Sequence, residues 1–194
     1  MSLGTKEQLE MWLKTIDVDC DKVLDAGSNK KNIKDRTRSF NVKELVGLDL
    51  EIPHNGEKTD IVCDLNVGMG ESNVITYLNY FDVAFCLEVS EYLWNIVQAL
   101  ENINLLLKKG GILYFSTHFI YPVHKPEGQD FIRLTKWGVE KLMEKAGFKI
   151  EELKPRTTED GEMLMDFFSK NKMRAMSGYK AHNEIGCLVK ATKI

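Results

Sequence analysis

The alternation of apolar runs and amphipathic segments along the chain predicts an α/β fold. Strand-like apolar runs occur at residues 22–26, 44–49, 59–64, 82–87 and 111–117. Several runs, such as DVAFCL and ILYFS, are apolar throughout and do not alternate with polar residues. Strands covered by helices on both faces have this character, whereas a sheet with one face open to water alternates. The pattern therefore predicts a mostly parallel, twisted sheet between two helical layers.

Segments with helical spacing lie before and between the strand-like runs. Apolar residues on one face predict a helix over 5–16, with Thr5 as its N-cap. A second apolar face over 93–107 predicts a helix that ends at the sequence KKGG, because lysine in the last turn and glycine just beyond it are typical of helix ends. Thr135 is expected to cap a third helix.

The C-terminal third has a different pattern. It predicts a strand at 148–154, a helix around 161–174 and a strand at 185–192. The short link from this helix to the last strand indicates that the last strand enters the sheet antiparallel. No repeat or linker divides the sequence, so we expect a single domain over residues 1–194, with an insert over 155–184.

Composition narrows the function classes. Of the 194 residues, 43% are hydrophobic and 28% charged, as in soluble globular proteins. The net charge of −3 disfavours general nucleic-acid binding. No run approaches the ~20 apolar residues of a membrane span, and the N-terminus lacks the pattern of a secretion signal. Residues 1–4 resemble a cloning remnant and are given no weight. The sequence does not indicate an oligomeric state.

The cysteines indicate a reducing compartment. The four cysteines are far apart and form no CxxC pair: Cys20, Cys63, Cys86 and Cys187. Three of them lie in apolar runs, where a reduced cysteine behaves as a small hydrophobic residue. We therefore expect neither a disulfide framework nor a zinc site, and a cytoplasmic location.

Carboxylates stand at the ends of two strand-like runs. The sequence VLDAGSN at 23–29 places Asp25 and Gly27 after the first run, and Asp49 ends the second. Parallel strands end at one edge of a sheet, where glycine lets the backbone approach a ligand and an acid can bind ribose hydroxyls. The pair predicts a nucleotide-type ligand over that edge. Taken singly, Asp25 is also a candidate helix cap and Asp49 a candidate turn residue.

Five segments, in this order and at these spacings, resemble a class I S-adenosylmethionine-dependent methyltransferase of the small-molecule type. They are VLDAGS at 23–28, VGLDL at 46–50, DIVCDLN at 60–66, FDVAFCLEVSEYL at 81–93 and LLLKKGGILYFSTH at 105–118. The resemblance covers about residues 20–150. It implies a Rossmann-like, doubly wound sheet of seven strands with an antiparallel last strand. It also implies S-adenosyl-L-methionine as cofactor and a small-molecule methyl acceptor, with 155–184 on the acceptor side.

The resemblance also implies which residues bind the cofactor. Asp49 matches the acid that binds both ribose hydroxyls, Asp64 the acid beside the adenine amino group, and Glu88 the segment along the methionine moiety. The implied set is Asp25, Gly27, Ser28, Asp49, Leu50, Asp64, Leu65, Cys86, Leu87 and Glu88.

The first motif departs from the family pattern D-x-G-x-G-x-G. Its second and third glycines are Asn29 and Lys31 here. Asparagine tolerates a left-handed backbone better than most residues. The departure bears on cofactor affinity and keeps open the alternative of a non-catalytic cofactor-binding or scaffold protein. A nicotinamide dehydrogenase ranks well behind, because its G-x-G-x-x-G motif is missing.

Acceptor chemistry is expected in the loop at 116–133, which is long for a connection after a strand. His118 and His124 are the candidate general bases if the acceptor must lose a proton, with Asp130 as an orienting carboxylate. Bracing of the loop is an equally good interpretation of His118. No third ligand stands at a metal-binding spacing, so the sequence assigns no metal. The basic run at 30–38 is interpreted as a solvated face, or alternatively as an attractor for an anionic acceptor.

Overall fold

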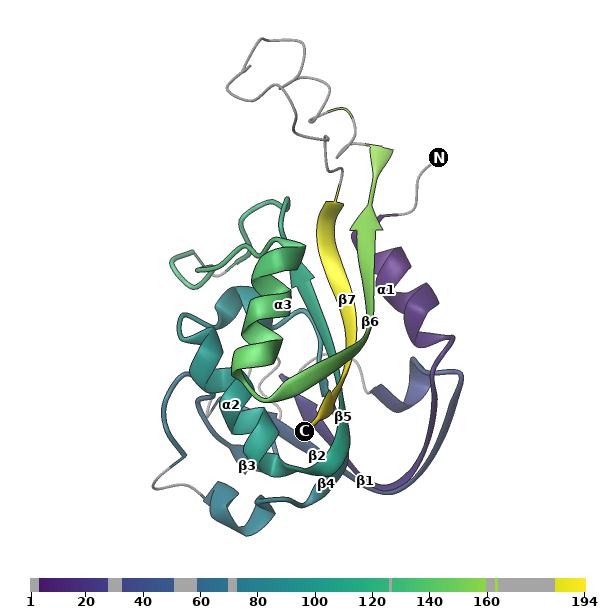
Figure 1. Cartoon of the computed structure of the whole chain (residues 1–194), viewed down its shortest axis with the longest axis vertical. Helices are drawn as coiled ribbons and strands as arrows, with labels where there is room; N and C mark the ends of the chain where they lie inside the picture. The colour runs from purple at the N-terminus through teal and green to yellow at the C-terminus, as the bar shows by residue number, and fades with distance from the viewer. Residues whose placement is uncertain are drawn as a thin grey trace.

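A single sheet of seven strands carries the fold, in the order β3-β2-β1-β4-β5-β7-β6 (Figure 1). The computed structural model describes residues 4–27, 33–50, 59–69, 73–125, 127–159, 163 and 184–194. The strands are β1 (Asp17–Ala26), β2 (Ser39–Asp49), β3 (Ile61–Val62), β4 (Phe81–Cys86), β5 (Leu107–His118), β6 (Phe148–Thr157) and β7 (Glu184–Lys193).

The strand directions confirm the predicted topology. Strands β3, β2, β1, β4 and β5 are parallel to their neighbours, whereas β7 is antiparallel to both β5 and β6. In the β5–β7 register, His118 is opposite Gly186. A Cβ atom on Gly186 would lie 2.2 Å from the carbonyl oxygen of Thr117. The close approach of the β5 and β7 backbones at this point therefore requires glycine.

Helices cover both faces of the sheet, as the uninterrupted apolar strands predict. The longer ones are α1 (Thr5–Leu13), α2 (Ile96–Leu106) and α3 (Lys136–Lys145), and the 3₁₀ turns are η1 (Ile33–Asp35), η2 (Asn73–Tyr77) and η3 (Ser90–Tyr92). In Figure 1, α2 and α3 lie on one side of the sheet and α1 lies on the other. Each side has its own buried apolar cluster. None of the helices that the structure describes is both long enough and apolar enough to cross a bilayer.

The hydrogen bonds confirm one predicted N-cap and correct another. Thr135 is the N-cap of α3, since its hydroxyl accepts a bond from the Gly138 N–H at 3.2 Å. Thr5 is not the N-cap of α1. Gly4 takes that position, and its own N–H donates to the Glu7 carboxylate at 2.8 Å. The helix expected around 161–174 lies outside the described residues, apart from Met163.

The KKGG sequence at 108–111 does not end a helix, contrary to the prediction. Helix α2 stops at Leu106, and these residues already belong to β5. Between β4 and β5 the register steps from Phe81–Leu107 to Val83–Ile112, so β5 carries extra residues in a bulge. Gly110, with φ of 77°, supplies the backbone conformation that the bulge needs. The lysines and glycines of the KKGG segment therefore form the bulge of β5 and not the end of a helix.

Candidate functional site

A cleft of about 740 Å³ lies over the carboxyl ends of β1, β2 and β4. Its volume falls within the range of pockets that hold small molecules and cofactors. Most of the residues that the resemblance implies for cofactor binding line this cleft: Asp25, Gly27, Asp49, Leu50, Asp64, Leu65, Leu87 and Glu88. The strand ends therefore bring these side chains to one edge.

One described residue of the implied set, Cys86, does not line the cleft, and another lies outside the described residues. Cys86 is the last residue of β4 and is fully buried in the core on the α2 side. Burial raises the pKa of its thiol far above the ordinary range. Ser28 lies outside the described residues, as do Asn29 and Lys31.

Gly27 occupies a position that other residues cannot take without strain. Its φ is +75°, and its N–H donates to the Leu48 carbonyl at 2.7 Å. A Cβ atom there would lie 2.3 Å from Cγ2 of Val89. The single glycine retained from the first motif is therefore needed for two reasons: its backbone conformation, and the close approach of Val89 in the loop after β4.

Asp25 is buried at the foot of the cleft. Burial raises the pKa of its carboxyl group to about 7, although the nearby Arg36 and a backbone hydrogen bond from Ile33 favour the ionised form. Arg36 also lines the cleft and forms an ion pair with Glu10 of α1 at 3.1 Å. Arg36 of the basic run is therefore part of the cleft wall and not of a solvated face.

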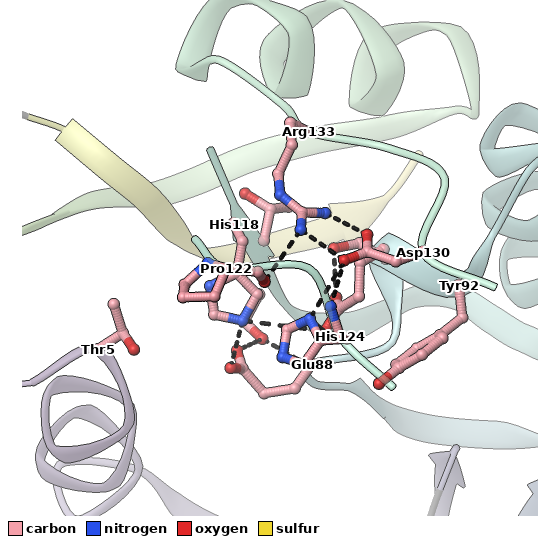
Figure 2. Close-up of polar contacts among 12 residues, drawn as sticks. Thr5, Glu88, Tyr92, His118, Pro122, His124, Asp130 and Arg133 are labelled. Atoms are coloured by element: carbon pink, nitrogen blue, oxygen red, sulfur yellow. Dashed lines mark hydrogen bonds and ion pairs between the residues drawn. The ribbon is translucent and has the colours of Figure 1, made fainter. Parts of the chain in front are cut away.

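Glu88 joins the cleft to a cluster of polar side chains behind it. The cluster consists of Glu88, Glu91, His118, His124, Asp130, Arg133 and Arg156. The Glu88 side chain lines the cleft, and the residue has a φ of 57° in the left-handed region. Its carboxylate accepts bonds from Ser116 Oγ at 2.6 Å and Arg156 at 2.9 Å, and lies 2.7 Å from Nε2 of His118 (Figure 2). Burial acts to raise the pKa of Glu88, but the contacts with His118 and Arg156 outweigh it and bring the pKa to about 2. Glu88 is therefore an ionised side chain of the cleft wall.

The predicted catalytic residues lie in the same cluster. Asp130 accepts a bond from the His124 backbone N–H at 2.7 Å and is bound by both terminal nitrogens of Arg133. The hydrogen bond from Arg133 is the main reason that the pKa of Asp130 falls to about 2. The structure thus brings His118, His124 and Asp130 together, but none of the three lines the cleft. Tyr121 does line it, and its ring stacks on His124.

Two residues of the cluster were not predicted from the sequence: Glu91, the carboxylate that lies close to both histidines, and Arg156, the cation that binds Glu88. As an acid in the first turn of η3, Glu91 carries no sequence signal for this cluster. It is 1% exposed, and its Oε1 lies 3.5 Å from His124 Nδ1 and 3.9 Å from His118 Nε2. Arg156 is fully buried in β6. The only signal for Arg156 was a cation at a position that pairs with the buried face of β7, within a strand of mostly exposed residues.

Comparison with known proteins gives a family-model match over part of the chain. The family model described as "Methyltransferase domain" matches residues 24–115. No curated protein sequence matches the chain. The matched segment contains the ends of β1, β2 and β4, and so most of the cleft.

Solved structures share the fold at low sequence identity. Phosphoethanolamine N-methyltransferase 2 of Haemonchus contortus, in complex with S-adenosyl-L-methionine, has a TM-score of 0.62 at 15% identity, over 96% of this chain and 52% of that one. The chain thus spans about half the length of that enzyme. An S-adenosylmethionine-dependent methyltransferase of Mesorhizobium loti has a TM-score of 0.61 at 14% identity, over 98% of each chain. The [4+2]-cyclase SpnF has a TM-score of 0.60 at 14% identity, over 96% of this chain and 78% of that one.

Proposed function

We propose that the chain is an S-adenosylmethionine-dependent methyltransferase, as the family model matched over residues 24–115 indicates, and that it transfers a methyl group to a small-molecule acceptor in the cleft. One observation carries the proposal. Carboxylates from three neighbouring strand ends, Asp25, Asp49 and Asp64, face one cleft of cofactor size. This is the arrangement in which open α/β sheets bind nucleotide-type ligands.

The residues present fit the cofactor that the family uses. Asp49 would bind the ribose hydroxyls, Asp64 and Leu65 would lie beside the adenine, and Asp25 with Gly27 would hold the methionine end. Leu50, Leu87 and Glu88 would complete the wall. When bound, S-adenosyl-L-methionine supplies an activated methyl group for in-line displacement. The work left to the protein is to align the acceptor and to exclude water.

Glu88 is the group that we assign to acceptor orientation. It is ionised, it is fixed from behind by Arg156 and Ser116, and it lines the cleft. A fixed carboxylate accepts a hydrogen bond from a hydroxyl or amine and positions it. His118 and His124 stay the candidate general bases, with Asp130 as the orienting carboxylate, because the two histidines contact Glu88 and Tyr121 of the cleft wall.

The experiment is a titration of S-adenosylhomocysteine into wild type and Asp49→Ala by calorimetry. We expect the variant to lose about 1–3 kcal/mol of binding free energy, the cost of leaving the buried partner groups of a ligand unpaired. Asp21→Ala is the matched control, since Asp21 pairs with Lys43 on the surface away from the cleft lining. Equal affinities in wild type and D49A would overturn the assignment.

The alternative is a protein that binds the cofactor without transferring its methyl group. The replacement of two motif glycines by Asn29 and Lys31 favours it, and the fold likeness to a cyclase shows that this architecture also serves other chemistry. Radiolabelled methyl transfer to a panel of small hydroxyl, amine and carboxyl acceptors separates the two. Binding of S-adenosylhomocysteine without any labelled product from the panel would favour the alternative.

A further inference from the structure

We propose that Glu91, His118 and His124 form a binding site for one divalent transition-metal ion behind the acceptor side of the cleft. Each residue offers one ligand atom, and the three atoms all lie within 4.8 Å of one another. They come from three separate places in the chain: η3, the end of β5 and the loop that follows it. Figure 2 shows both imidazoles directed toward the carboxylates of the cluster.

The spacing is close to that of a metal site. Ligand atoms about 2.0–2.1 Å from a tetrahedral metal lie about 3.3 Å from each other. Oε1 of Glu91 is 3.5 Å from Nδ1 of His124 and 3.9 Å from Nε2 of His118. A metal ion bound to all three atoms would therefore draw them slightly closer together than they lie here. Glu88 Oε2, 2.7 Å from the same His118 nitrogen, is placed to supply a fourth donor.

Burial and charge favour a cation at this position. Glu91 and His118 are each 1% exposed. Within the part of the chain that the structure describes, Glu91 Oε1 and His124 Nδ1 make no hydrogen bond, whereas His118 Nε2 lies 2.7 Å from Glu88 Oε2. The two arginines of the cluster bind other carboxylates, Arg133 binding Asp130 and Arg156 binding Glu88. A buried carboxylate needs a compensating charge, which a metal ion between Glu91 and the two imidazoles would supply.

The donor set selects the class of metal. Two imidazoles with one carboxylate suit Zn²⁺, Fe²⁺, Co²⁺ or Mn²⁺, whereas Mg²⁺ prefers an all-oxygen shell. The surroundings also hold the ligands in place. The Tyr121 ring lies 4.1 Å from the His118 ring and 4.6 Å from the His124 ring, centroid to centroid. Supporting contacts of this kind fix the orientation of metal ligands.

The test is metal binding by the full chain, after treatment with a chelator, in the absence of cofactor and acceptor. Its result is therefore independent of the proposed methyl transfer. All proteins carry Cys20→Ser, because Cys20 is the one described cysteine that is not buried. Calorimetry with Zn²⁺ should give one ion per chain, and Co²⁺ should give visible absorption bands that Zn²⁺ abolishes and millimolar Mg²⁺ does not.

Two variants and a control make the result specific. Glu91→Gln and His124→Asn should each weaken Zn²⁺ binding by more than about 100-fold, the upper effect of losing an outer-shell partner. Glu144→Gln, an exposed carboxylate on α3, should bind as wild type does. His124 is partly exposed on a loop, so H124N is expected to fold even where E91Q does not, as judged by circular dichroism. Absence of Zn²⁺ binding, or binding unchanged in H124N, would overturn the proposal.

Discussion

The guanidinium of Arg156 lies 2.9 Å from the carboxylate of Glu88, although β6 and β4 are separated in the sheet by β7 and β5. Arg156 also donates to the carbonyl oxygens of Thr117 and Thr5. One fully buried side chain therefore connects the cleft wall, β5 and the first turn of α1. The position of Glu88 in the cleft depends on a residue from the far edge of the sheet.

Replacing Arg156 with Met should destabilise the fold and loosen Glu88. Removing one partner of a buried ion pair costs about 3–5 kcal/mol, and we expect about 2 kcal/mol here because the Glu88 side chain is 30% exposed. Urea unfolding measures the loss. Arg38→Met is the control, because the pair of Arg38 with Asp17 is exposed and its removal should barely change the midpoint. Equal midpoints in R156M and wild type would contradict the anchoring role.

Gly27→Ala should lower both stability and cofactor affinity. A non-glycine residue in the left-handed region costs about 1–2 kcal/mol, and the contact of the new Cβ with Val89 adds to it. Gly128→Ala isolates the backbone cost, since Gly128 has a φ of 81° and nothing within 4 Å of its Cβ position. Thermal unfolding of both variants gives the comparison. The prediction is wrong if G128A loses as much stability as G27A.

The stability of the chain should fall as pH rises from about 4 to 7, and Asp25 should be a cause. The folded state raises the pKa of Asp25 to about 7 from an ordinary 3.8. In this window the folded chain holds a proton that the unfolded chain has released, so increasing pH favours unfolding. A change of about 3 pKa units corresponds to an effect on the order of 4 kcal/mol at completion.

Asp25→Asn should remove the part of this decrease in unfolding free energy with pH that Asp25 causes. Urea unfolding of D25N and wild type at pH 4.5 and 7.5 gives the difference, which should grow in favour of D25N at the higher pH. Glu88 and Asp130, with pKa values held near 2, act in the opposite direction below about pH 4.5 and do not enter this window. Unfolding free energies that differ by a constant amount at the two pH values would contradict the role of Asp25.

The cleft at the strand ends was predictable because its determinants are local. Asp25, Gly27 and Asp49 stand where uninterrupted apolar strands end, and parallel strands bring such ends to one edge. The parallel direction of the earlier strands followed from the same pattern and the antiparallel β7 from its short link to the preceding segment, but the strand order was not predicted. The KKGG segment shows where local rules fail. Its residues suit a helix end, but pairing with β4 places them in a bulged strand.

The polar cluster behind the cleft could not be assembled from sequence. His118 and His124 were identified by residue type, but Glu91 reaches them, and Arg156 reaches Glu88, only through tertiary packing. Glu91 precedes the histidines by a whole helix and strand, and Arg156 follows them by another helix. No spacing rule connects residues so far apart, because their contact depends on how β7 separates β5 from β6.

The insertion of β7 between β5 and β6 has a consequence for biosynthesis. Both flanking strands precede β7 in the sequence, so each leaves the ribosome with a bare edge toward the place that β7 will fill. Unpaired edges template association with other chains. Nascent protein halted before residue 184 should therefore be a client for chaperones that shield strand edges.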